Sequence, residues 1–191
     1  MNARLRPLAL LASLALALPA LAAPNESVAK PVKTVVQSVR YSKDDLAIKQ
    51  LANEAQGRFL LGEDWDKGTD AQRKEFTQLF NNLFSKIAFP KVRENFKNLA
   101  SITYEDPALE GDKAKVKSTI VIEHPLKKQE MKLLYTVVKE KSDWKVLDVA
   151  VLGDSMLTGI RDDQVRPIMQ QGGWEHLLDL MRKKNAELSK K

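Results

Sequence analysis

The clearest pattern in the chain is an apolar stripe at helical spacing between residues 69 and 88. Its members recur at steps of three and one residues, which places them on one face of an amphipathic helix. The stripe consists of Phe76, Leu79, Phe80, Leu83, Phe84 and Ile87. Thr69 and Gln72 have the spacing of a capping box at the start of this helix. We predict that Pro90 limits its end, because proline has no N–H for the helical hydrogen bond.

Two shorter helical patterns precede this stripe. The first has an apolar face made of Val32, Val35, Val36 and Val39, and Pro31 is placed to begin it. The second is predicted to be capped by Ser42 and Asp45. It runs through Leu46, Ile48 and Leu51. Gly57 and Gly62 then interrupt the pattern, which indicates turns or short helices before the long stripe.

After residue 100 the apolar positions recur at every second residue, the period of a strand that is buried on one face. The first such strand has Ala114, Val116, Ser118, Ile120 and Ile122 on one side and mainly lysine and threonine on the other. The second carries Met131, Leu133, Tyr135 and Val137, the third covers residues 144–151, and a weaker edge strand covers residues 102–105. The connecting segments EHPLKK and EKSD are short, which favours antiparallel hairpins.

The last part of the chain returns to a helical pattern. Pro167 is placed to begin or kink a helix, and Gly172–Gly173 separates it from the next one. One face of that final helix carries Trp174, Leu177, Leu178 and Met181. Helices, then strands, then helices predict an α+β fold: a curved antiparallel sheet of about four strands with helices packed on one face.

The N-terminus has the organisation of a secretory signal peptide. Arg4 and Arg6 precede an apolar run over residues 8–18, Pro19 ends the run, and small residues follow. The run is shorter than the about 20 apolar residues that span a bilayer. We therefore predict a signal peptide over residues 1–22 and a single exported domain over residues 23–191.

Composition narrows the chemistry that the exported domain can perform. The chain has no cysteine and only two histidines, which excludes thiol catalysis and disulfides and argues against a conventional zinc site. Loss of Arg4 and Arg6 with the signal peptide lowers the formal charge from +6 to +4. The basic residues are scattered among acidic ones, so no nucleic-acid surface is predicted. We predict no metal and no cofactor.

Gly153, Asp154 and Ser155 follow a strand and resemble the serine block of GDSL-type hydrolases. A catalytic triad needs a base beside the serine and a third group that orients the base. Only His176 follows this block, and Gly173 stands where such hydrolases have the aspartate. Ser155 is therefore interpreted as the cap of the following helix, and the protein is predicted not to be an enzyme.

Three stretches of the sequence together resemble one known family: LLGEDWDKGTDAQRKEFTQLFNNLF, DWKVLDVAVLGDSMLTGIRDD and GGWEHLLDLMRKKN. Their order and spacing resemble the MlaC, or toluene-tolerance, family of periplasmic phospholipid-binding proteins that serve an ABC transporter. The chain departs from the family pattern at Asp154, at residues 159–161 and near Gln164.

This resemblance implies a fold that encloses an apolar cavity for acyl chains. The residues we predict to contact lipid are Phe80, Phe84, Leu133, Tyr135, Val149 and Val151, with Met156 and Leu157 at the rim. The implied protein is a monomeric periplasmic carrier. It would shuttle glycerophospholipid between an outer-membrane lipoprotein-porin complex and an inner-membrane MCE-type ABC transporter, and so maintain outer-membrane lipid asymmetry.

Two other classes of protein fit the same elements. A small cavity enzyme would need an acid or base directed into the cavity, and Asp148, then Asp154, are the candidates. We predict Asp148 on the outer, solvated face of its strand, with Leu147, Val149 and Val151 directed inward. A periplasmic chaperone or adaptor would instead present an exposed apolar groove.

Overall fold

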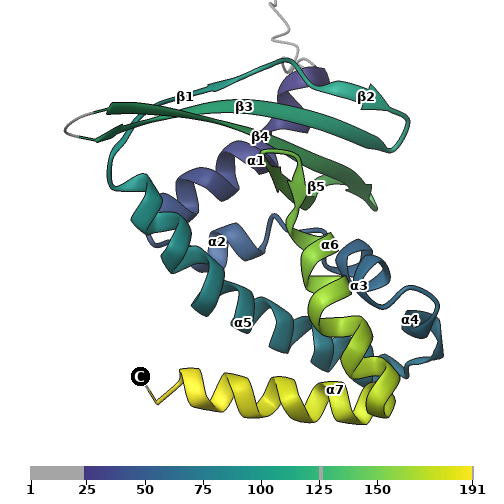
Figure 1. The fold of residues 1–191 in the computed structure, drawn as a ribbon. Helices are drawn as coiled ribbons and strands as arrows, with labels where there is room; N and C mark the ends of the chain where they lie inside the picture. Colours follow the sequence, from purple (N-terminus) through teal and green to yellow (C-terminus); the bar gives the residue numbers. More distant parts are fainter. Residues whose placement is uncertain (1–23, 125–126, 191) are drawn as a thin grey trace, which may run out of the picture.

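The computed structural model describes residues 24–124 and 127–190, so the predicted signal peptide and the start of the exported domain lie outside it. A single antiparallel sheet forms one layer, and the helices lie on one face of it (Figure 1). Helix α1 (Pro24–Arg40) crosses the underside of the sheet, and α5 (Asp70–Phe96) lies below it. Within the described residues, no helix combines the length and apolarity needed to cross a membrane.

The sheet has six strands, more than the approximately four predicted. They are β1 (Leu99–Tyr104), β2 (Ala108–Glu110), β3 (Lys113–His124), β4 (Lys127–Glu140), β5 (Asp143–Val151) and β6 (Asp154–Ser155). Their order is β1-β3-β4-β5-β6, and β2 pairs with β3 beside β1. The short strands β2 and β6 were not predicted because three and two residues are too few to show an alternating pattern.

The alternation predicted for β3 is confirmed. Its inward residues Ala114, Val116, Ser118, Ile120 and Ile122 are all buried. Leu133, Tyr135 and Val137 on β4 are buried beside them, and β4 pairs with β3 and β5 through the two predicted hairpins. The inner face of the sheet is therefore the face that packs against the helices.

The long helix begins as predicted but ends later. The Thr69 side chain accepts a hydrogen bond from the Gln72 N–H, and the Gln72 side chain accepts one from the Thr69 N–H, which completes the capping box. The helix continues through Pro90 to Phe96, so the predicted end at Pro90 is wrong. Pro90 is exposed and removes one backbone donor, whereas Val92 and Phe96 beyond it pack against the sheet. Burial of these two side chains offsets the loss.

The first two helices also differ from the prediction in their starts. Pro31 lies inside α1 instead of beginning it. Helix α2 (Asp44–Ile48) has no side-chain cap, and the Ser42 backbone has a positive φ of 57° that turns the chain between the helices. Leu51 lies beyond α2 and forms a bridge with Val146 on β5, so the predicted cap and length of this helix are wrong.

Two further helices fill the segment that the glycines interrupt. They are α3 (Asn53–Leu61) and α4 (Asp64–Lys67), in agreement with the predicted short helices. Gly57 lies within α3, where a Cβ atom would be 2.1 Å from a ring carbon of the buried Trp65. Gly62 ends α3 with a positive φ of 57°. Gly57 therefore permits close packing, and Gly62 permits the turn.

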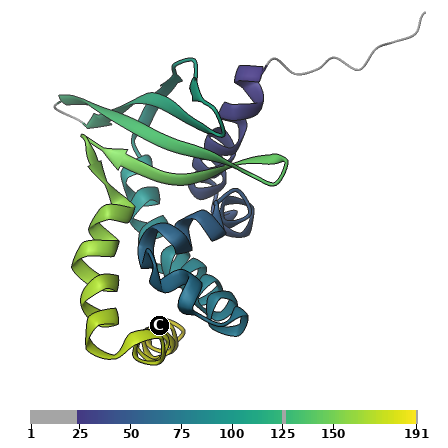
Figure 2. The same cartoon turned by 90° about the vertical axis from the view of Figure 1, so that its right-hand side faces the viewer.

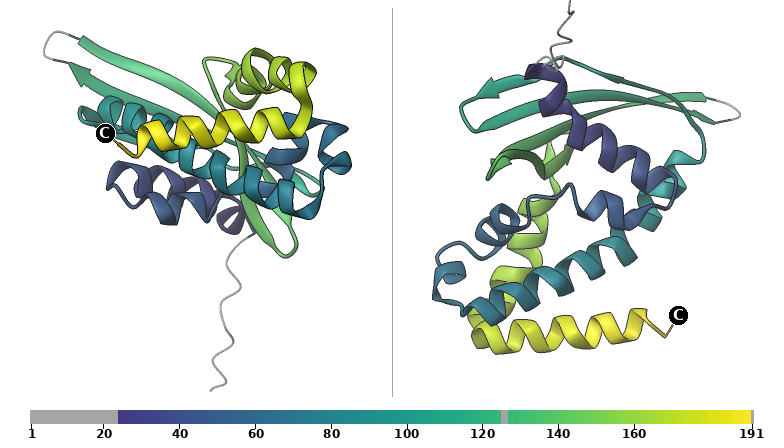
Figure 3. Two further views of the ribbon diagram at one scale, coloured as in Figure 1. Left: turned by 90° about the horizontal axis from the view of Figure 1, so that it is seen from below. Right: turned by 180° about the vertical axis from the view of Figure 1, so that it is seen from behind.

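The C-terminal part descends from the sheet and turns under the rest of the molecule (Figure 2). It comprises α6 (Met156–Ile160), the π-helix η1 (Arg161–Val165) and α7 (Arg166–Leu188). The predicted break at Gly172–Gly173 is confirmed, because both residues have non-helical backbone angles inside α7. Beyond this kink α7 lies alongside α5 (Figure 3).

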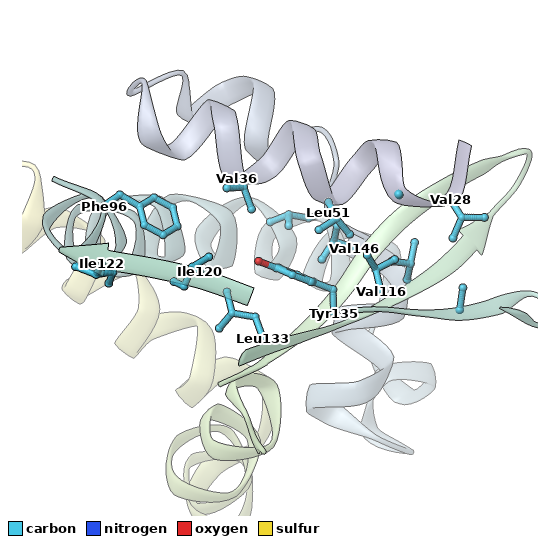
Figure 4. Packing of buried hydrophobic residues seen from close by; sticks show 14 residues of the cluster. Val28, Val36, Leu51, Phe96, Val116, Ile120, Ile122, Leu133, Tyr135 and Val146 are labelled. Carbon is cyan, nitrogen blue, oxygen red and sulfur yellow. The ribbon is translucent and has the colours of Figure 1, made fainter. Parts of the chain in front are cut away.

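The apolar residues form two main cores. We call the first the sheet core; it includes Val28, Val32, Val36, Phe96, Val116, Ile120, Tyr135, Val137 and Val146 (Figure 4). We call the second the helical core; it includes Leu60, Trp65, Phe76, Phe80, Leu157, Val165, Leu177, Leu178 and Met181. Phe84 on α5 packs against both, so this helix connects them.

Candidate functional site

An apolar cavity lies between the inner face of the sheet and helices α1 and α5. Its volume is about 200 Å³. One wall is formed by α1 and the second half of α5, with residues such as Val36, Val39, Ala88, Phe89 and Val92. The other wall is the sheet, with residues such as Ile120, Met131, Leu133, Tyr135, Val149 and Val151. The cavity is thus bounded by the two layers of the fold.

The lining of this cavity carries no charged side chain. Every lining residue is apolar except Asn95, which is exposed, and Tyr135, which has a hydroxyl group. Burial raises the pKa of the Tyr135 phenol, so the group stays neutral at physiological pH. A cavity of this composition favours hydrocarbon, and its lining contains no histidine, carboxylate, lysine or arginine.

Six of the eight predicted contact residues line the cavity. They are Phe84, Leu133, Tyr135, Val149, Val151 and Met156. The structure assigns Phe80 and Leu157 to the helical core instead. The Phe80 ring stacks between Phe76 and Phe84, at centroid distances of 5.8 and 5.7 Å, and does not reach the cavity. Leu157, the second residue of α6, is buried in that core.

Several lining residues were missed by the sequence prediction. Ala88, Phe89, Val92 and Phe96 lie near or beyond Pro90, where the helix was predicted to end. Their continuation of the helical spacing was the signal that could have identified them. The valines of α1 were recognised as an apolar face, but its partner in the fold was not predictable from local spacing.

The cavity is small for a lipid with two long chains. Sites for drug-sized ligands commonly measure about 300–1,000 Å³, whereas this cavity measures about 200 Å³. Phe84, Met131 and Val149 in its walls are only half-buried. A two-chain ligand would therefore require the helical wall and the sheet to move apart.

The turn that contains Ser155 is a capping arrangement. The Ser155 Oγ atom donates a 2.6 Å hydrogen bond to Asp148 and accepts a 3.0 Å hydrogen bond from the Thr158 N–H. The second Asp148 oxygen accepts a 3.0 Å hydrogen bond from the Leu157 N–H. Both side chains therefore satisfy donors at the start of α6, and the predicted role of Ser155 as a cap is confirmed.

The prediction for Asp148 needs a correction. Asp148 is half-buried against the start of α6 instead of lying free on the outer face, and it is not part of the cavity lining. His176, on α7, is also half-buried. No hydrogen bond joins His176 to Ser155 in the described part of the chain.

A bulge in β5 explains why Leu147 does not point toward the cavity. Thr136 pairs with Asp148 and Val137 pairs with Val146, so Leu147 is the extra residue of the strand. The Leu147 side chain packs against the helical core, and its carbonyl accepts a 2.9 Å hydrogen bond from Gln56. The bulge keeps Val149 and Val151 on the cavity side, as predicted, but moves Leu147 away from it.

Larger hollows lie on the surface, but their rims are polar. One of about 530 Å³ is flanked by Arg58 and Asp66, which form an ion pair with each other. Another of about 670 Å³ lies on the sheet beside Lys117 and Lys132. In residues 24–124 and 127–190, no group of His, Cys, Asp or Glu is arranged to hold a metal ion. The apolar cavity between the sheet and the helices is the better candidate, because its lining carries no charged side chain.

Comparisons with known proteins agree with this architecture. A phospholipid-binding protein from Ralstonia solanacearum, solved in complex with a phospholipid, superposes with a TM-score of 0.68 over 86% of this chain and 98% of that chain. The two sequences are 18% identical, so the likeness shows the fold. A chain named Rd1NTF2_05, carrying five substitutions, reaches a TM-score of only 0.40 at 12% identity, over 66% of this chain and 97% of that chain.

The sequence itself identifies the family. No curated protein matches the chain. The family model described as MlaC protein, however, matches residues 34–183, which include every residue of the cavity lining. That range covers most of the helices and the entire sheet. The chain therefore belongs to the MlaC protein family.

Proposed function

We propose that this protein is a phospholipid carrier that holds acyl chains in the cavity between the sheet and helices α1 and α5. The observation that carries the proposal is the composition of that cavity, whose lining is apolar except for Asn95 and Tyr135. The Ralstonia protein of the same fold was solved with a phospholipid, which supports the assignment of ligand class. Membership of the MlaC family supports it independently of the geometry.

The hydrophobic effect explains why such a ligand needs a carrier. A phospholipid with two long chains has roughly 30 methylenes, and each contributes about 0.8 kcal/mol on leaving water. Release into water is therefore very unfavourable. Movement of the acyl chains from one apolar site to another changes their hydrophobic free energy very little. A carrier can therefore take up and release lipid where it docks on another apolar site.

The proposal extends to the place and route of transport. The predicted signal peptide over residues 1–22 would direct the single domain over residues 23–191 to the periplasm. There the protein would act as a monomer between an outer-membrane lipoprotein-porin complex and an inner-membrane MCE-type ABC transporter. Direction would come from these partners, and the result would be maintenance of outer-membrane lipid asymmetry.

The two alternative classes are less well supported by the positions of specific residues. Asp148, the best candidate for an acid in a cavity enzyme, is engaged with Ser155 and the backbone of α6 outside the lining. For a chaperone, a continuous exposed apolar surface would be needed. The most exposed large apolar residues of the described chain lie on separate elements: Tyr41, Leu46, Ile87, Leu109 and Leu152.

The proposal is tested by extracting the purified mature protein with organic solvent and identifying the released lipid by mass spectrometry. We expect phospholipid with two acyl chains at about one molecule per protein. Refolded protein incubated with vesicles should recover the same stoichiometry. A protein that purifies folded and takes up no phospholipid under either condition would contradict the proposal.

A further inference from the structure

Two buried hydroxyl groups interrupt the apolar inner face of the sheet. Ser118 on β3 is only 2% exposed and Tyr135 on β4 is only 4% exposed. In the strand register Ser118 lies opposite Leu133, and Tyr135 lies opposite Val116, so the two are diagonal neighbours. They form one buried polar spot on this face. The half-buried Tyr104 on β1 lies opposite Ser118 and adds a third hydroxyl beside the spot, but it makes no hydrogen bond to either group among the described residues.

The two hydroxyl groups do not satisfy each other. Ser118 Oγ and Tyr135 Oη are 3.5 Å apart, which is long compared with the 2.5–3.0 Å of ordinary hydroxyl hydrogen bonds. Two hydroxyls carry two protons, and a single bond between them uses one. Neither group makes another hydrogen bond within residues 24–124 and 127–190. At least one buried donor is therefore left over, and buried donors usually have an acceptor.

The Tyr135 hydroxyl is the member of the pair that faces the cavity. Tyr135 belongs to the lining, whereas Ser118 does not. Figure 4 shows the phenol directed along the inner face toward the space between Val36, Ile120 and Leu133, all of which line the cavity. Any ligand in that space meets the hydroxyl and apolar side chains together.

We propose that Tyr135, supported by Ser118, donates a hydrogen bond to a carbonyl oxygen of the bound lipid. This inference rests on the proposed function and names a chemical feature of its ligand. The remaining group is a proton donor, and the acceptors that a lipid brings into an apolar site are the carbonyl oxygens of its acyl esters. The carboxyl group of a free fatty acid offers the same kind of oxygen.

The consequence is selectivity for the acyl linkage. A dialkyl ether lipid of the same headgroup and chain length has the same hydrocarbon but no carbonyl oxygen. Binding it would leave the Tyr135 donor without its acceptor. The protein should therefore bind the ester lipid more tightly than the ether lipid, even though the apolar lining makes the same contacts with the hydrocarbon chains of both.

The experiment is a competition between these two lipids. The full mature protein is equilibrated with vesicles that contain equal amounts of a diacyl phosphatidylglycerol and its dialkyl ether analogue, and bound lipid is counted by mass spectrometry. We expect about three- to tenfold enrichment of the ester lipid, the range that one neutral hydrogen bond provides. In Tyr135→Phe the enrichment should disappear because uptake of the ester lipid falls to the level of the ether lipid, while the melting temperature of the lipid-free protein stays close to that of the wild type.

Tyr41→Phe is the matched control, because it removes the same hydroxyl from an exposed tyrosine outside the cavity. This variant should retain the wild-type enrichment. A separate uptake measurement with oleate distinguishes an acid from an ester: a loss in Tyr135→Phe with oleate alone would assign the acceptor to a free carboxyl group.

The outcomes separate this inference from the proposed function. If phospholipid is taken up but neither the ester preference nor oleate uptake depends on Tyr135, the hydroxyl subsite is wrong and the carrier function stands. If the wild type takes up neither phospholipid nor oleate, the carrier function fails and the subsite fails with it.

Discussion

Ser155 and Asp148 illustrate how single polar residues are used in this protein. Their side chains satisfy two backbone donors at the start of α6 and bind each other at 2.6 Å. Gly153 and Asp154 before them resemble part of a hydrolase motif. The structure gives the serine a structural role, because its described hydrogen bonds join it to the Asp148 carboxylate and the Thr158 N–H at the start of α6, and none joins it to a histidine.

We predict that Ser155→Ala destabilises the protein by about 0.5–2 kcal/mol through loss of a helix cap. Lipid content should not change, because Ser155 does not line the cavity. Urea unfolding measures the loss of stability, and lipid extraction measures the lipid content. Ser155→Thr is the control, because it keeps a capping hydroxyl. Ester hydrolysis by the wild type that disappears in Ser155→Ala would overturn the structural role.

Gly57 provides a second test at the scale of one residue. A Cβ atom at this position would lie 2.1 Å from a ring carbon of Trp65, which is buried in the helical core. We predict that Gly57→Ala destabilises the protein by about 1–3 kcal/mol, because the ring has to move. Thermal or urea unfolding measures the effect.

Gly159→Ala is the matched control for Gly57→Ala. Gly159 also lies in a helix, but a Cβ atom at this position would have its nearest neighbour 4.0 Å away, on Asp163. Alanine should be neutral or should stabilise the protein by about 0.4–1 kcal/mol there. Equal effects of the two substitutions would show that the packing of Trp65 on α3 is not as close as described.

At the scale of elements, α5 has the central position. Its first half packs in the helical core, and its second half covers the sheet and the cavity. Helix α7 is fastened to the first half by Arg182, whose guanidinium donates hydrogen bonds of 2.7 and 2.9 Å to Glu75. The second half of α5 is held to α2 by Arg93, which donates a 2.6 Å hydrogen bond to Asp44.

The pair between Glu75 and Arg182 predicts a pH dependence of stability. The hydrogen bonds from Arg182 hold the pKa of the Glu75 carboxyl below its usual value of 4.5. A lowered folded-state pKa stabilises the protein above the usual value, and the contribution is lost as the pH falls through the lowered pKa. The difference in unfolding free energy between wild type and Glu75→Gln should therefore be present at pH 7 and shrink below pH 4.

The control for this pair is Glu110→Gln, which removes an exposed carboxylate of β2 that forms no ion pair in the described part of the chain. Glu110→Gln should change the unfolding free energy only slightly at both pH 7 and pH 3. A Glu75→Gln effect that is equally large at pH 7 and pH 3 would show that the carboxylate charge is not what links α5 to α7.

At the scale of the whole molecule, the decisive question is whether the space between the layers is a ligand site or loose core. Val149 and Val137 are inward-facing valines on neighbouring strands, and they separate the two cases. Val149 lines the cavity and is half-buried, whereas Val137 is fully buried in the sheet core away from it. The same substitution at both positions thus places the same bulk in different surroundings.

We predict that Val149→Trp abolishes lipid uptake while the lipid-free protein keeps nearly wild-type thermal stability, because the indole occupies the cavity. Val137→Trp should instead destabilise the protein by about 1–3 kcal/mol or more by overpacking. Lipid counts and thermal melts of delipidated proteins measure both effects. If delipidated Val149→Trp is as unstable as Val137→Trp, then Val149 belongs to ordinary core and the cavity is not the lipid site.

Sequence patterns by themselves determined the features that depend on neighbouring residues. Alternation identified β3, β4 and β5, the spacing of Thr69 and Gln72 identified the start of α5, and two glycines identified the kink in α7. Such features follow from backbone geometry and local hydrogen bonds, which the chain encodes within a few residues. The family resemblance also belongs here, because it rests on order and spacing along the chain.

Tertiary structure alone decided how those elements meet. Phe80 and Phe84 share one helical stripe, yet only Phe84 reaches the cavity, because α5 passes from one core to the other between them. Pro90 did not end the helix, because Val92 and Phe96 gain burial against a sheet that is distant in sequence. Ser118 and Tyr135 come together only through the pairing of β3 with β4. Contacts of this kind depend on packing between remote segments, and no local pattern encodes them.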